Sequence, residues 1–238
     1  MSIKDEYHGF VNLLEDYKIK HGEFSNATLI VKLSILIFVL EHIELENDEY
    51  RINLLEDIIS HYNNAPQPAT TRSPVIIENN GENLFVFIPD VDNQPYNRYR
   101  NEVKPFIINV DNPINIENNK WYMYVVTIDN KFLILDSPLT TVELITGRNS
   151  ILLENIQPQH PHLLCDYEEL KVKSAGELLF VTEKENNNIQ ILINNKSGHF
   201  KPDISSLDNA ALTLSGILKI SEKQIHKIPM DFAAVLNR

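Results

Sequence analysis

A proline-rich segment at residues 63–74, NNAPQPATTRSP, constrains the fold of this chain more than any other feature of its sequence. The segment holds three prolines and no large apolar residue. Each proline lacks a backbone N–H and restricts the residue before it, so a helix or a central strand does not continue through the segment. Apolar residues recur at helical spacing before it and in short strand-like runs after it. The segment therefore predicts a boundary between a helical part and a β-rich part.

The residues before this boundary predict three helices. Apolar side chains recur every three or four residues in two stretches, which are Tyr7, Phe10, Val11, Leu14 and Tyr17, and then Ile52, Leu55, Ile58, Ile59 and Tyr62. Between them, residues 29–40 form the most apolar run of the chain, which Lys32 and Ser34 interrupt. A helix that spans a bilayer needs about 20 apolar residues, so this run predicts a buried helix and no membrane span. Residues 1–65 are expected to form a helical subdomain.

The residues after the boundary predict strands. Short runs rich in β-branched and aromatic residues occupy residues 75–77, 84–88, 106–110, 121–128, 132–135, 176–182 and 189–193. Asp129 and Asn130 separate two of these runs and suit a tight hairpin turn. A helix is expected over residues 205–217, with Asp203 or Ser205 as its cap. The fold class is therefore α+β, with the helical subdomain followed by a largely antiparallel β module at residues 75–238 that carries this late helix.

The composition is that of an ordinary globular protein, with 43% hydrophobic and 23% charged residues. The formal net charge of −12 repels phosphate backbones and anionic lipid surfaces, so nucleic-acid binding is not expected. The best basic stretch combines Arg98, Arg100 and Lys104 with Tyr96 and Tyr99. This stretch fits a polar loop with locally packed tyrosines better than a nucleotide or phosphopeptide site.

Cysteine usage and the N-terminus bear on the location of the protein. Cys165 is the single cysteine, so no intrachain disulfide or multi-thiolate metal site is expected, and a reducing compartment fits. Residues 1–6, MSIKDE, show no cationic leader followed by an apolar segment. We therefore expect a cytoplasmic protein, or one that is exported without a classical signal peptide.

Three widespread cofactor and metal motifs are missing from the sequence. The patterns GxxxxGKS/T, GxGxxG and HExxH are all absent, which argues against P-loop NTPases, Rossmann oxidoreductases and zincins. The sequence therefore names no cofactor. His160, His162, His199 and Asp166 are of types that suit zinc or iron. However, Pro161 disfavours two neighbouring imidazole rings that face one ion from a regular strand, so no metal site is predicted.

The string INNKSGHFKPD at residues 193–203 carries the most suggestive polar residues. It follows an expected strand and precedes the expected late helix, a position where a turn projects polar groups out of a sheet. Gly198 permits backbone conformations that other residues resist, and Pro202 stiffens the entry to the helix. On an extended backbone, Ser197 and His199 share one face with Cβ atoms about 6 to 7 Å apart. A direct hydrogen bond between them therefore needs a turn at Gly198.

These residues resemble a module found in the C-terminal half of plant IQ-motif-containing proteins and in bacterial proteins of undefined function. That module joins an AGRL or AGEL strand to SGHYxP or SGHFxP and a helix, and this chain reads AGEL at residues 175–178 and SGHFKP at residues 197–202. Family members carry an HSSxL-like segment upstream, where this chain reads HPHLL at residues 160–164 and keeps only the histidine, His160, before the leucine. The resemblance covers about residues 121–229. No IQ segment is present, so calmodulin binding is not expected.

Two classes of function remain open from the sequence. In the first, the chain is a non-enzymatic interaction or ligand-binding protein, such as a bacterial effector or accessory protein. Its loops around His160 and His199 recognise a protein or a small molecule, with Glu177 and Lys201 as ligand-binding residues. In the second, it is a transferase or hydrolase in which His199 acts as general acid or base while Ser197 and His160 orient the substrate. A structural interpretation stands beside both, in which His199 bonds backbone carbonyls to hold the turn and Glu177 is solvated or paired with a lysine.

Overall fold

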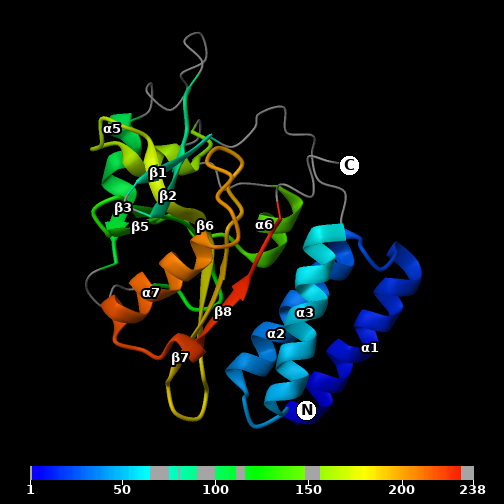
Figure 1. Cartoon of the computed structure of the whole chain (residues 1–238). Coiled ribbons are helices and arrows are strands. Elements are labelled where there is room, and N and C mark those ends of the chain that lie inside the picture. The colour runs from blue at the N-terminus through cyan, green and yellow to red at the C-terminus, as the bar shows by residue number, and fades with distance from the viewer. Residues whose placement is uncertain are drawn as a thin grey trace.

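The computed structural model of the chain describes residues 2–64, 75–79, 81–89, 100–110, 116–147 and 156–231. The proline-rich boundary from residue 65 onward lies outside these residues. So do Tyr96, Arg98 and Tyr99 of the basic stretch. Figure 1 shows the described elements as a central sheet with three N-terminal helices on one side and a late helix on the other.

Three helices open the chain, and they are α1 (Ile3–His21), α2 (Asn26–Glu41) and α3 (Asp48–Asn64). They confirm the three helices expected from the apolar spacing. A capping box starts α1, because the Ser2 hydroxyl accepts the Asp5 N–H while the Asp5 carboxylate accepts the Ser2 N–H. Most of α2 is buried because this helix packs against α1, α3 and the sheet. Among the described residues, no helix combines the length and the apolar character that crossing a bilayer requires.

The described strands form one 8-stranded sheet. Six of them lie in the order β1-β2-β6-β4-β5-β3, and β7 pairs with both β6 and β8. Every pairing is antiparallel except that of β7 with β8, so the expected largely antiparallel sheet is confirmed. The strands are β1 (Val75–Asn79), β2 (Glu82–Val86), β3 (Ile107–Asn109), β4 (Trp121–Thr127), β5 (Phe132–Leu135), β6 (Lys171–Thr182), β7 (Ile189–Asn194) and β8 (Ile225–Ile228).

Helical segments connect the strands. The late helix α7 (Ser206–Leu218) confirms the helix expected over residues 205–217. The Asp203 carboxylate accepts the Ser206 N–H at its start, as expected of a cap. The shorter segments are α5 (Arg100–Val103), η1 (Lys104–Phe106), α6 (Thr141–Thr146), η2 (His160–Leu164) and η3 (Glu222–Gln224).

The two faces of the sheet are covered by different helices. On one face, sheet residues pack in one cluster with α1, α2 and α3, and these residues are Trp121, Leu179, Val181 and Leu192. On the opposite face, their neighbours along the strands pack against α7, and these are Tyr122, Tyr124, Leu178, Phe180, Ile191 and Ile193. Successive residues of a strand point to opposite faces, which explains this alternation. The N-terminal helices therefore share a core with the sheet, as the layers in Figure 1 show.

Two features of the sheet differ from the expectation. Strand β8 follows α7 and pairs in parallel with β7, because Ile225 and Ile228 bury their side chains in the two core clusters. Strand β6 begins at Lys171 rather than at residue 176, because its polar N-terminal residues alternate with the buried Val172 and pair with β2 and β4. Both features depend on partners distant in the sequence.

Candidate functional site

The SGH segment folds into a tight turn between β7 and α7. The Ser197 hydroxyl oxygen accepts the Phe200 N–H at 3.3 Å, and the Ser197 carbonyl oxygen accepts the Lys201 N–H at 2.9 Å. Ser197 is fully buried, and Phe200 fills a buried apolar cluster together with Phe85. The segment is therefore not extended. The serine that was expected to orient a substrate helps to hold this turn.

His160 lies in η2 and is buried against β6. Its Nε2 donates a hydrogen bond to the Gly176 carbonyl oxygen at 2.9 Å. Burial is the main cause that lowers the pKa of His160 to about 3; the nearby His199 and Lys196 also lower it, and the hydrogen bond to the Gly176 carbonyl opposes them. The structure therefore brings His160 and His199 into one neighbourhood. At neutral pH, His160 is an uncharged imidazole that fixes the backbone of β6.

Glu177 is paired with the last residue of β7 and with a lysine just beyond it. Its Oε2 accepts a hydrogen bond from Asn194 Nδ2 at 2.9 Å, and its backbone N–H donates to Asn194 Oδ1 at 3.0 Å. Lys196 Nζ lies 3.7 Å from Glu177 Oε1. These contacts match the structural interpretation in which a lysine pairs with Glu177. They leave the carboxylate engaged with the chain itself.

Gly176 allows β6 to approach the end of β7 closely. A Cβ atom at this position would lie 1.9 Å from the Asn194 carbonyl oxygen, closer than any side chain permits. The same carbonyl oxygen accepts a hydrogen bond from the Tyr124 hydroxyl at 3.0 Å. The glycine of the AGEL string is therefore required by packing between two backbone segments.

Asn195 joins the turn to the C-terminal end of the described chain. Its Nδ2 donates to the Pro202 carbonyl oxygen at 2.9 Å and to the Met230 carbonyl oxygen at 3.0 Å, and its Oδ1 accepts the Met230 N–H at 2.7 Å. Asn194 and Asn195 were not among the residues predicted from the sequence to form the site. The signal was present, because two amides at the end of an apolar strand are well suited to satisfy the backbone groups that leave a sheet.

His199 and Lys201 complete the turn. The His199 ring is partly exposed and lies edge-on to Phe87, with centroids 5.0 Å apart and an interplanar angle of 89°. Lys201 is buried and has a φ of 45°, in the left-handed region that residues with side chains rarely adopt. The predicted site residues thus lie around one turn. His160 and Glu177 form hydrogen bonds with other elements of the chain, while the Ser197 hydroxyl and carbonyl oxygens accept the Phe200 and Lys201 N–H groups within the turn.

The residues considered for metal binding have other contacts. His162 Nδ1 accepts the Gln159 N–H at 2.9 Å, and Asp166 Oδ1 lies 2.5 Å from Lys104 Nζ. Across the described ranges, no three His, Cys, Asp or Glu side chains are grouped in a way that could hold a metal ion. The single cysteine, Cys165, is partly exposed.

The β1–β2 hairpin lies at an edge of the sheet and is a second candidate site. Strand β1 pairs with β2, and no other described strand pairs with it. Val75, Ile76 and Ile77 leave 39%, 46% and 43% of their surfaces exposed. Ile88, just beyond β2, is also exposed. The hairpin therefore presents apolar side chains on both faces of an edge strand.

Comparisons of the chain with protein-family models, with curated proteins and with solved structures found no match.

Proposed function

We propose that this protein is a non-enzymatic interaction protein that binds an extended segment of a partner protein along the outer edge of β1. The observation that carries the proposal is an edge strand whose three consecutive apolar residues, Val75, Ile76 and Ile77, are all exposed. Within the described residues, one side of β1 pairs with β2 and the other side has no strand beside it. An edge of this kind offers a row of backbone donors and acceptors to an added strand.

The side chains of β1 add apolar contacts to this backbone pairing. Residues of a strand alternate between its two faces, so Ile76 lies on one face while Val75 and Ile77 lie on the other. The antiparallel register places Ile76 beside Phe85 and Ile77 beside Leu84, both of which are buried. An added strand with apolar residues at alternate positions would extend these cross-strand pairs by one strand.

Charge favours a partner segment that is basic. Glu78 is exposed at the end of β1 nearest the hairpin turn, and the whole chain carries a formal net charge of −12. Opposite charges on paired strands stabilise the pairing modestly, and a complementary net charge speeds association. The proposed partner is therefore an extended segment with alternating apolar residues and a lysine or arginine that pairs with Glu78.

The turn residues support an interaction protein over a transferase or hydrolase. A general acid or base works best when its pKa lies near the operating pH. Burial lowers the pKa of His160 to about 3, and its Nε2 is bonded to the backbone of β6. The buried Ser197 hydroxyl accepts a backbone N–H of its own turn. His160 and Ser197 therefore stabilise the fold, and the hydrogen bonds that they form with the backbone engage the groups that an enzyme would need for its substrate.

The edge can be tested with a library of random peptides displayed on phage. Selection on the wild-type protein should enrich peptides with alternating apolar residues and at least one basic residue. Ile76→Lys should abolish binding of the enriched peptides, because a lysine on an edge strand opposes the addition of another strand. Ile19→Lys is the matched control, since Ile19 is 83% exposed on α1 and belongs to another element.

Two results would contradict the proposal. One is enriched peptides that bind the wild type and Ile76→Lys equally well. The other is a wild-type dimer in sedimentation velocity that Ile76→Lys converts to monomer, because the edge would then be occupied by a second copy of this chain.

A further inference from the structure

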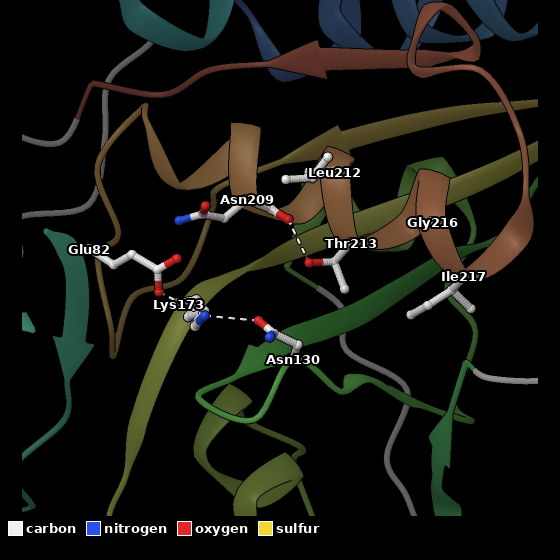
Figure 2. Close-up of a pocket in the computed structure, with 8 residues that line it drawn as sticks. All are labelled: Glu82, Asn130, Lys173, Asn209, Leu212, Thr213, Gly216 and Ile217. Carbon is white, nitrogen blue, oxygen red and sulfur yellow. Dashed lines mark hydrogen bonds and ion pairs between the residues drawn. The ribbon is translucent and has the colours of Figure 1, made fainter. Parts of the chain in front are cut away.

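A pocket with a volume of about 450 Å³ opens between α7 and the sheet. Figure 2 shows its lining, which comes from four parts of the chain: Glu82, Asn130, Lys173, Asn209, Leu212, Thr213, Gly216 and Ile217. The volume falls within the range of small-molecule sites, which is roughly 300 to 1,000 Å³.

A β-bulge directs Lys173 into this pocket. Val126 of β4 pairs with Ser174, but the next residue, Thr127, pairs with Val172, so Lys173 is an extra residue in β6. Val172 packs into the core on one face, while the Ser174 hydroxyl bonds to Tyr124 and contacts α7 on the other. Bulges commonly redirect a side chain beside a functional site. Here the bulge lets a charged residue near the start of β6 face α7.

Lys173 forms the polar centre of the pocket. Its side chain is only 13% exposed, and its Nζ lies 2.7 Å from Glu82 Oε2 and 2.8 Å from Asn130 Oδ1. An ammonium group has three donors, so one remains for a ligand after these two contacts. Figure 2 shows the three side chains in a row across the opening.

Asn130 is held in place by the β4–β5 turn. It has a φ of 60°, in the left-handed region that asparagine tolerates, and its N–H donates to the Thr127 carbonyl oxygen. Within the same turn, Asp129 accepts hydrogen bonds from the Thr127 and Tyr167 hydroxyls at 2.5 and 2.9 Å. Because Asn130 Oδ1 accepts from Lys173, its amide nitrogen presents two further donors.

The opposite wall is one side of α7. Thr213 donates its hydroxyl to the Asn209 carbonyl oxygen at 2.7 Å, so the hydroxyl oxygen can still accept a hydrogen bond. Leu212 and Ile217 supply the apolar part of the lining. A Cβ atom built on Gly216 would meet no atom within 4 Å, so this glycine leaves room beside the helix.

We propose that this pocket binds a free α-amino acid with an apolar side chain. Its carboxylate would accept hydrogen bonds from Lys173 and Asn130, while its ammonium group would donate to Glu82. Lys173 Nζ and Glu82 Oε2 lie 2.7 Å apart, which matches a ligand whose ammonium and carboxylate groups are both attached to one carbon atom. The apolar side chain would then contact Leu212 and Ile217. A nucleotide fits less well, because Glu82 repels phosphate and the lining has no aromatic ring for a base.

The test is to titrate the full chain with each of the twenty L-amino acids and to measure binding by calorimetry or by NMR chemical-shift changes. Leucine, isoleucine, valine or methionine should bind. The same amino acid with its amine acetylated or its carboxylate amidated should bind about ten-fold more weakly or worse, because a charge-assisted hydrogen bond is lost at one end. Lys173→Gln should weaken binding to a similar degree.

Two glycine variants distinguish a loss of binding caused by a filled pocket from one caused by unfolding of the protein. Gly216→Leu adds a side chain to the pocket lining at a position where the added Cβ meets no atom within 4 Å, and it should abolish binding. Gly9→Leu is the matched control, because Gly9 is also an exposed glycine within a helix and its added Cβ also meets open space. The proposal is overturned if none of the apolar amino acids binds the wild type, or if one binds Gly216→Leu as tightly as it binds Gly9→Leu.

Discussion

Single residues decide how the end of β7 meets β6. Gly176 is the clearest case, because its missing side chain makes room for the Asn194 carbonyl oxygen. That oxygen accepts a hydrogen bond from Tyr124, and the Gly176 carbonyl oxygen accepts one from His160. Gly176 therefore lies where a hydrogen bond from β4 reaches β7 and a hydrogen bond from η2 reaches β6.

We expect Gly176→Ala to lower the free energy of unfolding by about 2 to 3 kcal/mol, because backbone atoms must move to admit the methyl group. Gly9→Ala provides the control, since its methyl group meets open space within α1 and should raise stability by up to about 1 kcal/mol. Urea unfolding of the three proteins measures both changes. Equal stability of Gly176→Ala and the wild type would show that the two strands are not held this closely.

At the scale of elements, α2 is an apolar helix that carries one buried charge. Lys32 is fully buried, and its Nζ lies 2.6 Å from Glu23 Oε1 and 2.9 Å from Asp57 Oδ2. Asp57 belongs to α3 and Glu23 to the loop before α2. The ion pairs therefore join three consecutive segments. A buried ion pair costs desolvation energy, so it contributes less to stability than its distances suggest.

Two variants compare the effect on stability of removing the Lys32 charge with the effect of removing its two acidic partners. Lys32→Met should change the free energy of unfolding by no more than about 1 kcal/mol, because an apolar side chain of similar length replaces a buried ion. The double variant Glu23→Gln with Asp57→Asn should lose about 3 kcal/mol, because it leaves the Lys32 charge uncompensated. Chemical denaturation at pH 7 measures both. A larger loss for Lys32→Met than for the double variant would contradict this ranking.

At the scale of the whole molecule, three buried or partly buried histidines make the fold sensitive to acid. Burial lowers the pKa of His160 to about 3 and that of His61 and His226 to about 4. Lys32 lowers the pKa of His61 further while Asp57 and Glu23 oppose it, and Arg51 lowers that of His226. Each histidine returns to an ordinary pKa of about 6.5 when the chain unfolds. The unfolded chain therefore binds more protons than the folded chain below that pH.

The free energy of unfolding should be highest above about pH 6.5 and fall as the pH decreases toward the folded pKa values. Between pH 7.5 and 5.5 we expect a loss of about 2 to 4 kcal/mol, measured by urea unfolding across that range. Asp129 contributes nothing in this window. Its pKa lies below the ordinary value because burial, which raises it, is outweighed by hydrogen bonds from Thr127, Lys131 and Tyr167.

His61→Leu tests the origin of this pH dependence. Neither ring nitrogen of His61 forms a hydrogen bond of normal geometry with a described residue, so leucine should destabilise the fold little at pH 7.5. The variant should lose about a third of the acid sensitivity, since it removes one of three histidines. A free energy of unfolding that stays constant between pH 7.5 and 5.5 in the wild type would refute the mechanism.

The sequence predicted elements whose signal is local. The spacing of Tyr7, Phe10, Val11 and Leu14 predicted α1, and the run from residue 29 predicted a buried helix. The strand β8 was not predicted, because its four residues join the sheet only by pairing with β7 across the whole of α7. The pocket was missed for the same reason, since its lining is assembled from β2, β6, α7 and the turn before β5.

At the candidate site, the sequence predicted the local structure of the residues but not the contacts that decide their roles. The sequence by itself determined that Ser197, Gly198 and His199 lie in a turn between a strand and a helix, because hydrophobic periodicity and glycine and proline positions are properties of neighbouring residues. Only the tertiary structure decided that His160 meets Gly176 and that Lys173 faces α7. Hydrogen bonds, burial and the β-bulge depend on segments that folding brings together. The chemistry of each polar group is set by those neighbours.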